Sequence, residues 1–487
     1  MKSLHNRKPA ILIIWSMAAC LMASCGSSSP TLAPAKGVTI NEVAIFQGVK
    51  RTLVKDGKEV ASTVPLIAER DTLIRVSYKT DSTYDGQEVT AWLTIDGSPP
   101  VFYQNKLTLV GQSAEKDLAT TINFYPGKSD ITDPLKYSIE VLQEGGAAEG
   151  NPGARHPAEG YSTVKIEGQK NTLRLLLVPF KYKADGSNRL PDTSAAQLKK
   201  FKERFLQLYP VSDVEISLHA PIDWDKAIGP TGAGWQEVGL RLLQVRTESK
   251  VSDDTYLYGF FDPAATLKEY CGWGCMLGVT LLNSTPANTG IVSLRLALGV
   301  GFVDHATDTA AHEIGHSHGR MHANCGPGLS PSSIDPSYPD DAAHKGGKIG
   351  VYGFDMFTRQ LVPPTSSDIM GYCDQKWISD YNFTAFHNRG KNVNLAFTEA
   401  PPGGSFGYDL ISVNLDGSAE GRWTRPVKRT RPLVSGEALP VILDGEKTVR
   451  GELFRFDHLP AAWLFVPQTG ASSAAFSVDG RSFMVQR

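Results

Sequence analysis

The chain of 487 residues lacks the features that mark nucleic-acid-binding and membrane-spanning proteins. Its charge is nearly balanced, with 49 Lys and Arg against 51 Asp and Glu, and it has no basic stripe or acidic tail. This balance argues against a nucleic-acid partner. After the N-terminal segment, no apolar run is long enough to span a bilayer. No repeat of solenoid length is evident either.

Cysteine is also scarce, with six in the whole chain. Four of them follow Cys25, namely Cys271, Cys275, Cys325 and Cys373. An even number in an exported chain favours disulfides, and Cys271 and Cys275 are close enough in sequence to close a tight loop. A four-thiolate zinc site is disfavoured, because Cys325 and Cys373 have no Cys-x-x-Cys partner.

The N-terminus has the layout of an export signal. Basic residues such as Lys2 and Arg7 precede an apolar stretch, 10–23, that is too short to span a bilayer. Residues 21–25 read Leu-Met-Ala-Ser-Cys and resemble a bacterial lipobox. The resemblance implies cleavage before Cys25 and lipidation of its thiol. We therefore expect an exported protein, anchored to the bacterial cell envelope by this lipid alone; secretion after ordinary signal cleavage is the alternative.

Hydrophobic patterning divides the rest of the chain. Alternating residues such as Ile74, Val76 and Tyr78 predict half-buried strands in the first part, and a similar texture returns near the C-terminus. Between them, the apolar run 173–180 is typical of a strand buried on both faces, and a helical stripe follows at 194–208. Alternation of strands and helices predicts an α/β unit.

We therefore expect an α+β multidomain protein whose α/β catalytic domain is flanked by two β-domains. The expected segments are a lipoprotein-type signal peptide at 1–24, a tether at 25–36, a β-sandwich at 37–168, the catalytic domain at 169–391 and a C-terminal β-domain at 392–487.

Residues 312–322 carry the most specific signal in the chain. They read His-Glu-Ile-Gly-His-Ser-His-Gly-Arg-Met-His, which is H-E-x-x-H-x-x-G-x-x-H. On a helix, His312 and His316 lie one turn apart on the same face and can reach one metal ion. Gly319 can end the helix at a positive φ, so that His322 returns as a third ligand. Three histidines leave a fourth position open for water, as in catalytic zinc sites.

Glu313 lies beside this water in the pattern. Zinc lowers the pKa of a bound water to about 7 and polarises a carbonyl, so Glu313 is the expected general base that passes the proton to the leaving amine. Five fixed positions would arise by chance in a chain of this length on the order of once in several thousand cases. The pattern therefore predicts a metal-dependent hydrolase.

Together with residues 367–373, Ser-Asp-Ile-Met-Gly-Tyr-Cys, the motif resembles the metzincin zinc peptidases. Within that group it is similar to secreted bacterial multidomain enzymes with flanking β-domains. The resemblance implies that Met370 forms the Met-turn beneath the ligands and that Cys325 pairs with Cys373. It also implies that Tyr372 stabilises the oxyanion, with a buried structural role as the alternative.

The expected function is an exported zinc-dependent endopeptidase that cleaves extracellular or host proteins, with a polypeptide or glycoprotein as substrate. One alternative is a surface adhesin or glycan-binding lipoprotein with a vestigial protease domain. Another is a zinc hydrolase of non-peptide bonds. One catalytic zinc is the expected cofactor. Calcium is a weaker candidate, because Asp335, Asp340 and Asp341 do not have EF-hand spacing.

Overall fold

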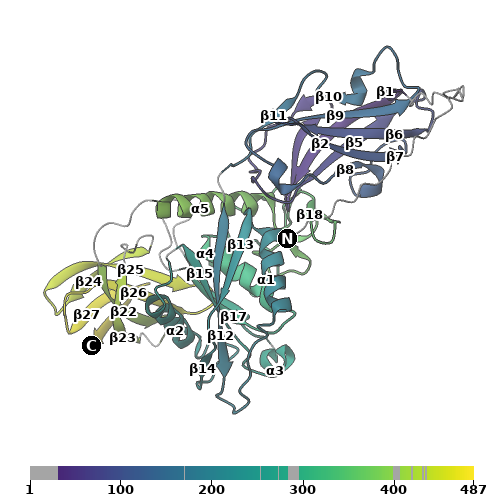
Figure 1. The fold of residues 1–487 in the computed structure, drawn as a ribbon. Coiled ribbons are helices and arrows are strands. Elements are labelled where there is room, and N and C mark those ends of the chain that lie inside the picture. Colours follow the sequence, from purple (N-terminus) through teal and green to yellow (C-terminus); the bar gives the residue numbers. More distant parts are fainter. Residues whose placement is uncertain are drawn as a thin grey trace, which may run out of the picture.

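The computed structural model (Figure 1) describes residues 31–168, 171–252, 254–272, 274–282, 295–398, 406–417, 420–429, 433 and 436–487. The expected signal peptide and Cys25 lie outside these residues. None of the described helices combines the length and the apolar character that a bilayer crossing requires.

Two antiparallel sheets form the N-terminal part of the molecule (Figure 1). The first contains β1 (Leu32–Pro34), β6 (Glu88–Ile95), β7 (Val101–Thr108), β9 (Leu135–Glu144), β10 (Arg155–His156) and β11 (Ser162–Val164). The second contains β2 (Val38–Phe46), β3 (Lys50–Lys55), β4 (Lys58–Glu59), β5 (Leu73–Thr80) and β8 (Ile122–Phe124). Their facing side chains, including Val43, Val76, Leu93 and Ile139, share one buried core.

The central part is built on a mostly parallel set of strands. It contains β12 (Thr172–Tyr182), β13 (Asp213–Leu218), β14 (Ile222–Trp224), β15 (Thr255–Phe261), β16 (Gly278–Leu282) and β17 (Leu296–Val300). Strand β12 pairs in parallel with β13, β14 and β15, and β15 pairs in parallel with β17. Strand β16 is antiparallel to β17.

Strand β12 is buried on both faces, which confirms the prediction made from the apolar run 173–180. Leu175 and Leu177 belong to one core, and Val178 and Phe180 belong to another. The first core includes side chains of α1 (Ala195–Leu208), α4 (Ala306–Ser317) and α5 (Asp380–Thr398), and the second includes those of α2 (Trp235–Glu248). The zinc-motif helix α4 therefore lies directly against this sheet.

The shorter elements surround these layers. They are α3 (Leu267–Cys271), the paired strands β18 (Gly353–Asp355) and β19 (Gln360–Val362), the paired strands β20 (Ser367–Asp368) and β21 (Lys376–Trp377), and the 3-10 turns at Leu118–Thr120, Lys128–Asp130, Pro152–Ala154 and Pro331–Ser333.

The C-terminal strands extend the central sheet. They are β22 (Phe406–Asn414), β23 (Gly421–Arg429), β24 (Glu437–Leu443), β25 (Lys447–Phe456), β26 (Ala461–Pro467), β27 (Ser473–Val478) and β28 (Arg481–Gln486). Strand β25 pairs with β16, with Leu281 opposite Phe456 and Leu282 opposite Arg455. The result is a single 13-stranded sheet that runs from β13 to β28.

This architecture overturns the expected fold class. The described chain is mostly β, with 40% strand against 17% helix and five α-helices, and its strands form large sheets. The predicted α+β protein with an α/β catalytic domain between β-domains is therefore wrong. The reason is the backbone pairing of β16 with β25, which joins central and C-terminal strands that the sequence patterns treat as separate.

The loop after the zinc motif holds a histidine between two carboxylates. Nδ1 of His344 lies 3.0 Å from Asp341, and its Nε2 lies 2.8 Å from Asp380 at the start of α5. Burial alone lowers the pKa of His344, but the two carboxylates outweigh it and raise that pKa above its ordinary value. The protonated form of this histidine therefore helps to hold the loop against α5.

Replacing His344 with Gln is expected to destabilise the protein in a pH-dependent way. Because the folded-state pKa is raised, the contribution is full below the unfolded pKa of about 6.5 and is lost as the pH rises through the folded value. The free energy of unfolding, measured in urea, should fall more at about pH 5.5 than at about pH 8.5, by up to about 1 kcal/mol. The partly buried His219, which belongs to no candidate metal cluster among the described residues, serves as control in the variant His219→Gln. An equal loss at both pH values would contradict the ion-pair account.

Candidate metal centre

Helix α4 places the first two histidines of the motif. Ala310 and Ile314 are fully buried in the core beneath the helix. His312 and His316 lie one turn apart, and their Nε2 atoms are 3.0 Å from each other. Both rings are buried, with exposed fractions of 5% and 0%.

The chain reverses direction immediately after α4 and returns the third histidine. Gly319 has a φ of +81°, which a side chain would oppose, although the space around it is open. The reversal brings Nε2 of His322 to 3.1 Å from Nε2 of His316. The three Nε2 atoms therefore converge, as the spacing of the motif predicts.

The other ring nitrogen of each histidine is tied to the backbone. The Nδ1 to carbonyl oxygen distances are 2.7 Å for His312 to Ile369, 2.6 Å for His316 to Arg320 and 3.2 Å for His322 to Ser333. A carbonyl oxygen only accepts, so each Nδ1 carries the hydrogen and each Nε2 presents a lone pair. Such backbone partners are typical of metal-binding histidines.

This donor set fits a metal ion. Three lone pairs at this separation cannot hydrogen-bond to one another, and a cation between them removes their repulsion. Zinc binds imidazole nitrogen at about 2.0–2.1 Å, so the nitrogens of a tetrahedral site lie about 3.3–3.4 Å apart. The observed 3.0 and 3.1 Å are close to that spacing. The cluster is compatible with a zinc site.

Burial keeps the three rings neutral. It lowers the pKa of His312 and of His316 well below the ordinary value, with His322 as the second cause in each case. Burial and the neighbouring His458 lower the pKa of His322 to about 4. Neutral imidazole is the form that binds a metal, so the site is ready for one at neutral pH.

Glu313 lies next to the cluster with its carboxylate buried. One of its oxygens is within 4.8 Å of a ring nitrogen of His316. Burial, and then the neighbouring Asp457 carboxylate, raise the pKa of Glu313 well above its usual range. Strand β16 passes so close that a Cβ on Gly278 would lie 2.3 Å from Oε1. A glycine is therefore needed where the strand backbone meets this carboxylate.

Met370 lies beneath α4 and supports it. It is fully buried, and a Cβ on Gly315 would lie 2.4 Å from its sulfur, so helix and methionine pack with only a glycine between them. Its amide donates to Oδ1 of Asp368 at 2.7 Å. Asp368 is itself buried and also accepts from the Ser379 amide and the Asn382 side chain. This network fixes the turn that carries the Ile369 carbonyl.

Tyr372 reaches the cluster from the same turn. Its hydroxyl lies 2.9 Å from Nε2 of His322, and burial raises the pKa of its phenol. The tyrosine amide donates to the Cys325 carbonyl, and the Cys325–Cys373 disulfide joins the two segments. The phenol is therefore held as a neutral hydrogen-bond donor beside the three histidines.

Removing the Cys325–Cys373 bridge is expected to cost stability. The bridge closes a loop of 48 residues, for which the chain-entropy model gives about 4 kcal/mol. The double variant Cys325→Ser, Cys373→Ser should show this loss in urea unfolding. Its matched control, Cys271→Ser with Cys275→Ser, opens a loop of only four residues and should lose about half as much. Equal losses would contradict the expected dependence of the stabilisation on loop length.

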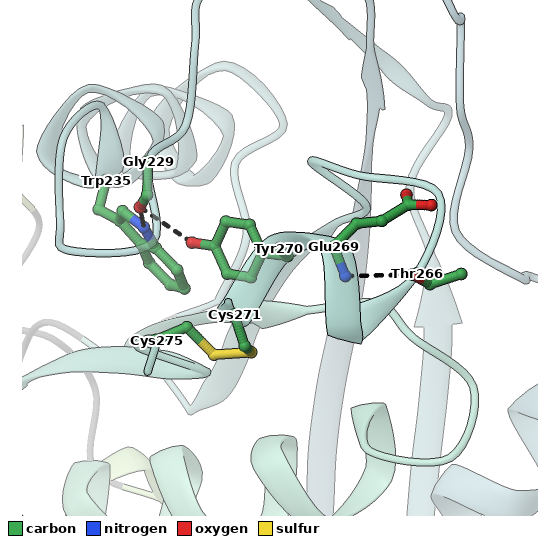
Figure 2. Close-up of a disulfide and its surroundings, with 7 residues drawn as sticks. All are labelled: Gly229, Trp235, Thr266, Glu269, Tyr270, Cys271 and Cys275. Carbon is green, nitrogen blue, oxygen red and sulfur yellow. Dashed lines mark hydrogen bonds between the residues drawn. A yellow bond between two sulfur atoms is a disulfide. The ribbon is translucent and has the colours of Figure 1, made fainter. Parts of the chain in front are cut away.

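The Cys271–Cys275 disulfide shapes the edge of a cleft in front of the cluster. Figure 2 shows this disulfide at the end of α3. The neighbouring Tyr270 hydroxyl donates a hydrogen bond to the Gly229 carbonyl at 2.9 Å, and the Trp235 indole N–H donates to the same carbonyl at 3.0 Å. The cleft has a volume of about 480 Å³. Its lining includes Cys275, Leu277, Gly278, His312, Glu313 and Tyr372.

Two further residues of the site are not signalled by the motif. Asp457 and His458 follow β25 and enter the cluster from the C-terminal strands. Oδ2 of Asp457 lies 3.4 Å from Nε2 of His316 and 2.9 Å from Nε2 of His458. Burial raises the pKa of Asp457, but the His458 partner outweighs it and the pKa is lowered overall. Two adjacent residues, Asp and His, match no known sequence motif, so the sequence alone could not assign Asp457 and His458 to the site.

The acidic loop does not assemble a calcium site. Asp335 accepts from Arg320 at 2.5 Å and from the Tyr381 hydroxyl at 3.0 Å, and Asp341 pairs with His344. Among the described residues, the clusters able to hold a metal do not include Asp335, Asp340 or Asp341.

Comparison with known proteins leaves the site to be interpreted from its own geometry. No protein-family model matches the chain, and no curated protein matches its sequence.

Proposed function

We propose that this protein is a zinc-dependent endopeptidase with a metzincin-type site. The observation that carries the proposal is the convergence of three histidine lone pairs, each fixed by a backbone carbonyl, beside the buried carboxylate of Glu313. The donor set of neutral imidazoles is one that zinc prefers. A bound zinc ion would lower the pKa of a water to about 7 and polarise the scissile carbonyl.

Glu313 serves as the general base in this account. Burial raises the pKa of the Glu313 carboxyl and makes its carboxylate a stronger base. It can therefore take a proton from an attacking water and return it to the leaving amine. Oε2 of Glu313 has no hydrogen-bond partner among the described residues, which leaves it available to a water. Tyr372 donates its phenolic hydrogen to the developing oxyanion.

The cleft suits an extended polypeptide. Strand β16 pairs with β25 at Leu281 and Leu282, and its Thr280 exchanges hydrogen bonds with Asp457, so among the described pairings this edge has no partner strand only at Gly278 and Val279. Such an edge can pair with the backbone of a peptide, which would then pass the zinc cluster. This supports peptide bonds, rather than other hydrolysable bonds, as the target. Extracellular or host proteins and glycoproteins are the proposed substrates.

Export supports this assignment of substrate. The two disulfides are compatible with an extracellular location. The lipobox-like segment at 21–25 is the basis for proposing a lipid anchor at Cys25 on the cell envelope. The catalytic cleft would then act on proteins outside the cytoplasm.

Cleavage mapping on a protein mixture tests the proposal. Wild-type protein is expected to generate new N-termini in an extracellular protein extract, and 1,10-phenanthroline should abolish them. Adding zinc after removal of the chelator should restore the same cleavage sites. Cleavage that persists without metal would overturn the zinc mechanism. A zinc-loaded protein that cleaves no polypeptide would overturn the peptidase assignment.

A further inference from the structure

The turn after β25 occupies the edge of β16 beside the metal cluster. The pairing of Leu281 with Phe456 continues by one residue, because the Asp457 amide donates to the Thr280 carbonyl at 3.1 Å. The Thr280 amide in turn donates to Oδ1 of Asp457 at 2.9 Å. Continued by one further residue, this register brings His458 alongside Val279, next to Gly278. The turn is therefore fixed on the strand edge that a peptide would approach.

His458 belongs to the same cluster of candidate metal ligands as the three motif histidines. One of its ring nitrogens and the ligand nitrogens of His312, His316 and His322 all lie within 4.8 Å of one another. Tetrahedral zinc needs about 3.3–3.4 Å between nitrogens, so a small side-chain adjustment completes a four-histidine site. The histidine is mostly buried, with 22% of its side chain exposed.

Its surroundings are those of a metal-binding histidine. Nε2 of His458 lies 2.9 Å from the fully buried Asp457 carboxylate and 2.8 Å from the Tyr372 hydroxyl. A carboxylate on one ring nitrogen orients an imidazole and strengthens its other nitrogen as a ligand, so Nδ1 of His458 is the expected metal-binding atom. The same carboxylate is held by β16, so the orientation of His458 depends on the pairing of β25 with that strand.

We propose that His458 is a fourth protein ligand of the metal and that the Asp457–His458 turn caps the active site. The inference rests on the proposed zinc site. A site with four protein nitrogens has no position for water, which is the mark of a closed, non-catalytic centre. The described arrangement is then the resting form. Withdrawal of the turn exposes both the fourth metal position and the edge of β16, so one movement admits the water and the peptide together.

Cobalt substitution tests the fourth ligand without relying on catalysis. The wild-type protein loaded with Co²⁺ should show the strong visible absorption of a four-coordinate site. His458→Ala should weaken and shift that absorption, because water would replace the imidazole. Its zinc dissociation constant should rise at least about tenfold. His458→Gln, which keeps a polar side chain of similar length, provides a second variant. His219→Ala, at a partly buried histidine outside the cluster, is the control.

The cap adds an expectation for activity. Hydrolysis of a short peptide by His458→Ala should be faster than by wild type at saturating zinc. Unchanged cobalt spectra and zinc affinity in both His458 variants would overturn the proposal while leaving the three-histidine site intact. A slower hydrolysis with an unchanged spectrum would also overturn it and would instead make His458 a catalytic group. Failure of the wild type to bind cobalt or zinc would refute the proposed function itself.

Discussion

Replacing Glu313 with Gln is expected to reduce kcat/KM for protein substrates by about 10²–10⁴. The amide has nearly the same shape but cannot take a proton from water. The substitution leaves the three histidines with converging Nε2 atoms in place, so the variant should keep its metal. The measurement is peptide hydrolysis with zinc content determined on the same sample.

The control for this variant removes another buried carboxylate. Glu452 lies on β25, pairs with Arg450 at 2.8 Å and belongs neither to the candidate metal clusters nor to the lining of the cleft. Glu452→Gln should keep activity close to wild type. A Glu313→Gln variant that retained more than about a tenth of wild-type activity would contradict the assignment of a general base at this position.

Replacing His316 with Ala is expected to abolish zinc binding. His316 is the central residue of the three-histidine cluster, since its Nε2 lies within about 3 Å of both other Nε2 atoms. Losing it should weaken zinc binding by more than the 10–100-fold that accompanies loss of an outer partner. Activity should then disappear at any practical zinc concentration.

A stability measurement gives this prediction a second readout. Zinc present at 1,000 times its dissociation constant should stabilise the wild type by about 4 kcal/mol. The same zinc should leave the unfolding midpoint of His316→Ala unchanged, whereas His219→Ala, at a histidine outside the cluster, should respond like the wild type. Equal stabilisation of all three proteins would show that zinc binds elsewhere.

The local part of the site could be predicted from sequence because its geometry is local. His312 and His316 are four residues apart, so a helix alone brings them together. Gly319 signals the reversal that returns His322. The carbonyls that orient the rings are less accessible, because Ile369 belongs to a turn almost sixty residues away and its position depends on packing.

The fold was less predictable for a related reason. The continuous apolar run of β12 correctly predicted that this strand is buried on both faces. The pairing of Leu281 with Phe456 joins segments that are far apart in sequence. Backbone hydrogen bonds make this pairing, and they require no particular side chains that a sequence pattern could reveal. The expected α/β domain was wrong because this pairing merges the strands into one large sheet. Asp457 and His458 were missed with it.

The dependence of hydrolysis on zinc can be measured by titrating metal-free protein with zinc and following the cleavage of denatured casein and of mucin at each step. Hydrolysis should be absent without metal, rise in proportion to added zinc and level off at one zinc per chain. Hydrolysis that is already complete before zinc is added would contradict this expectation. So would full zinc loading without cleavage of either substrate.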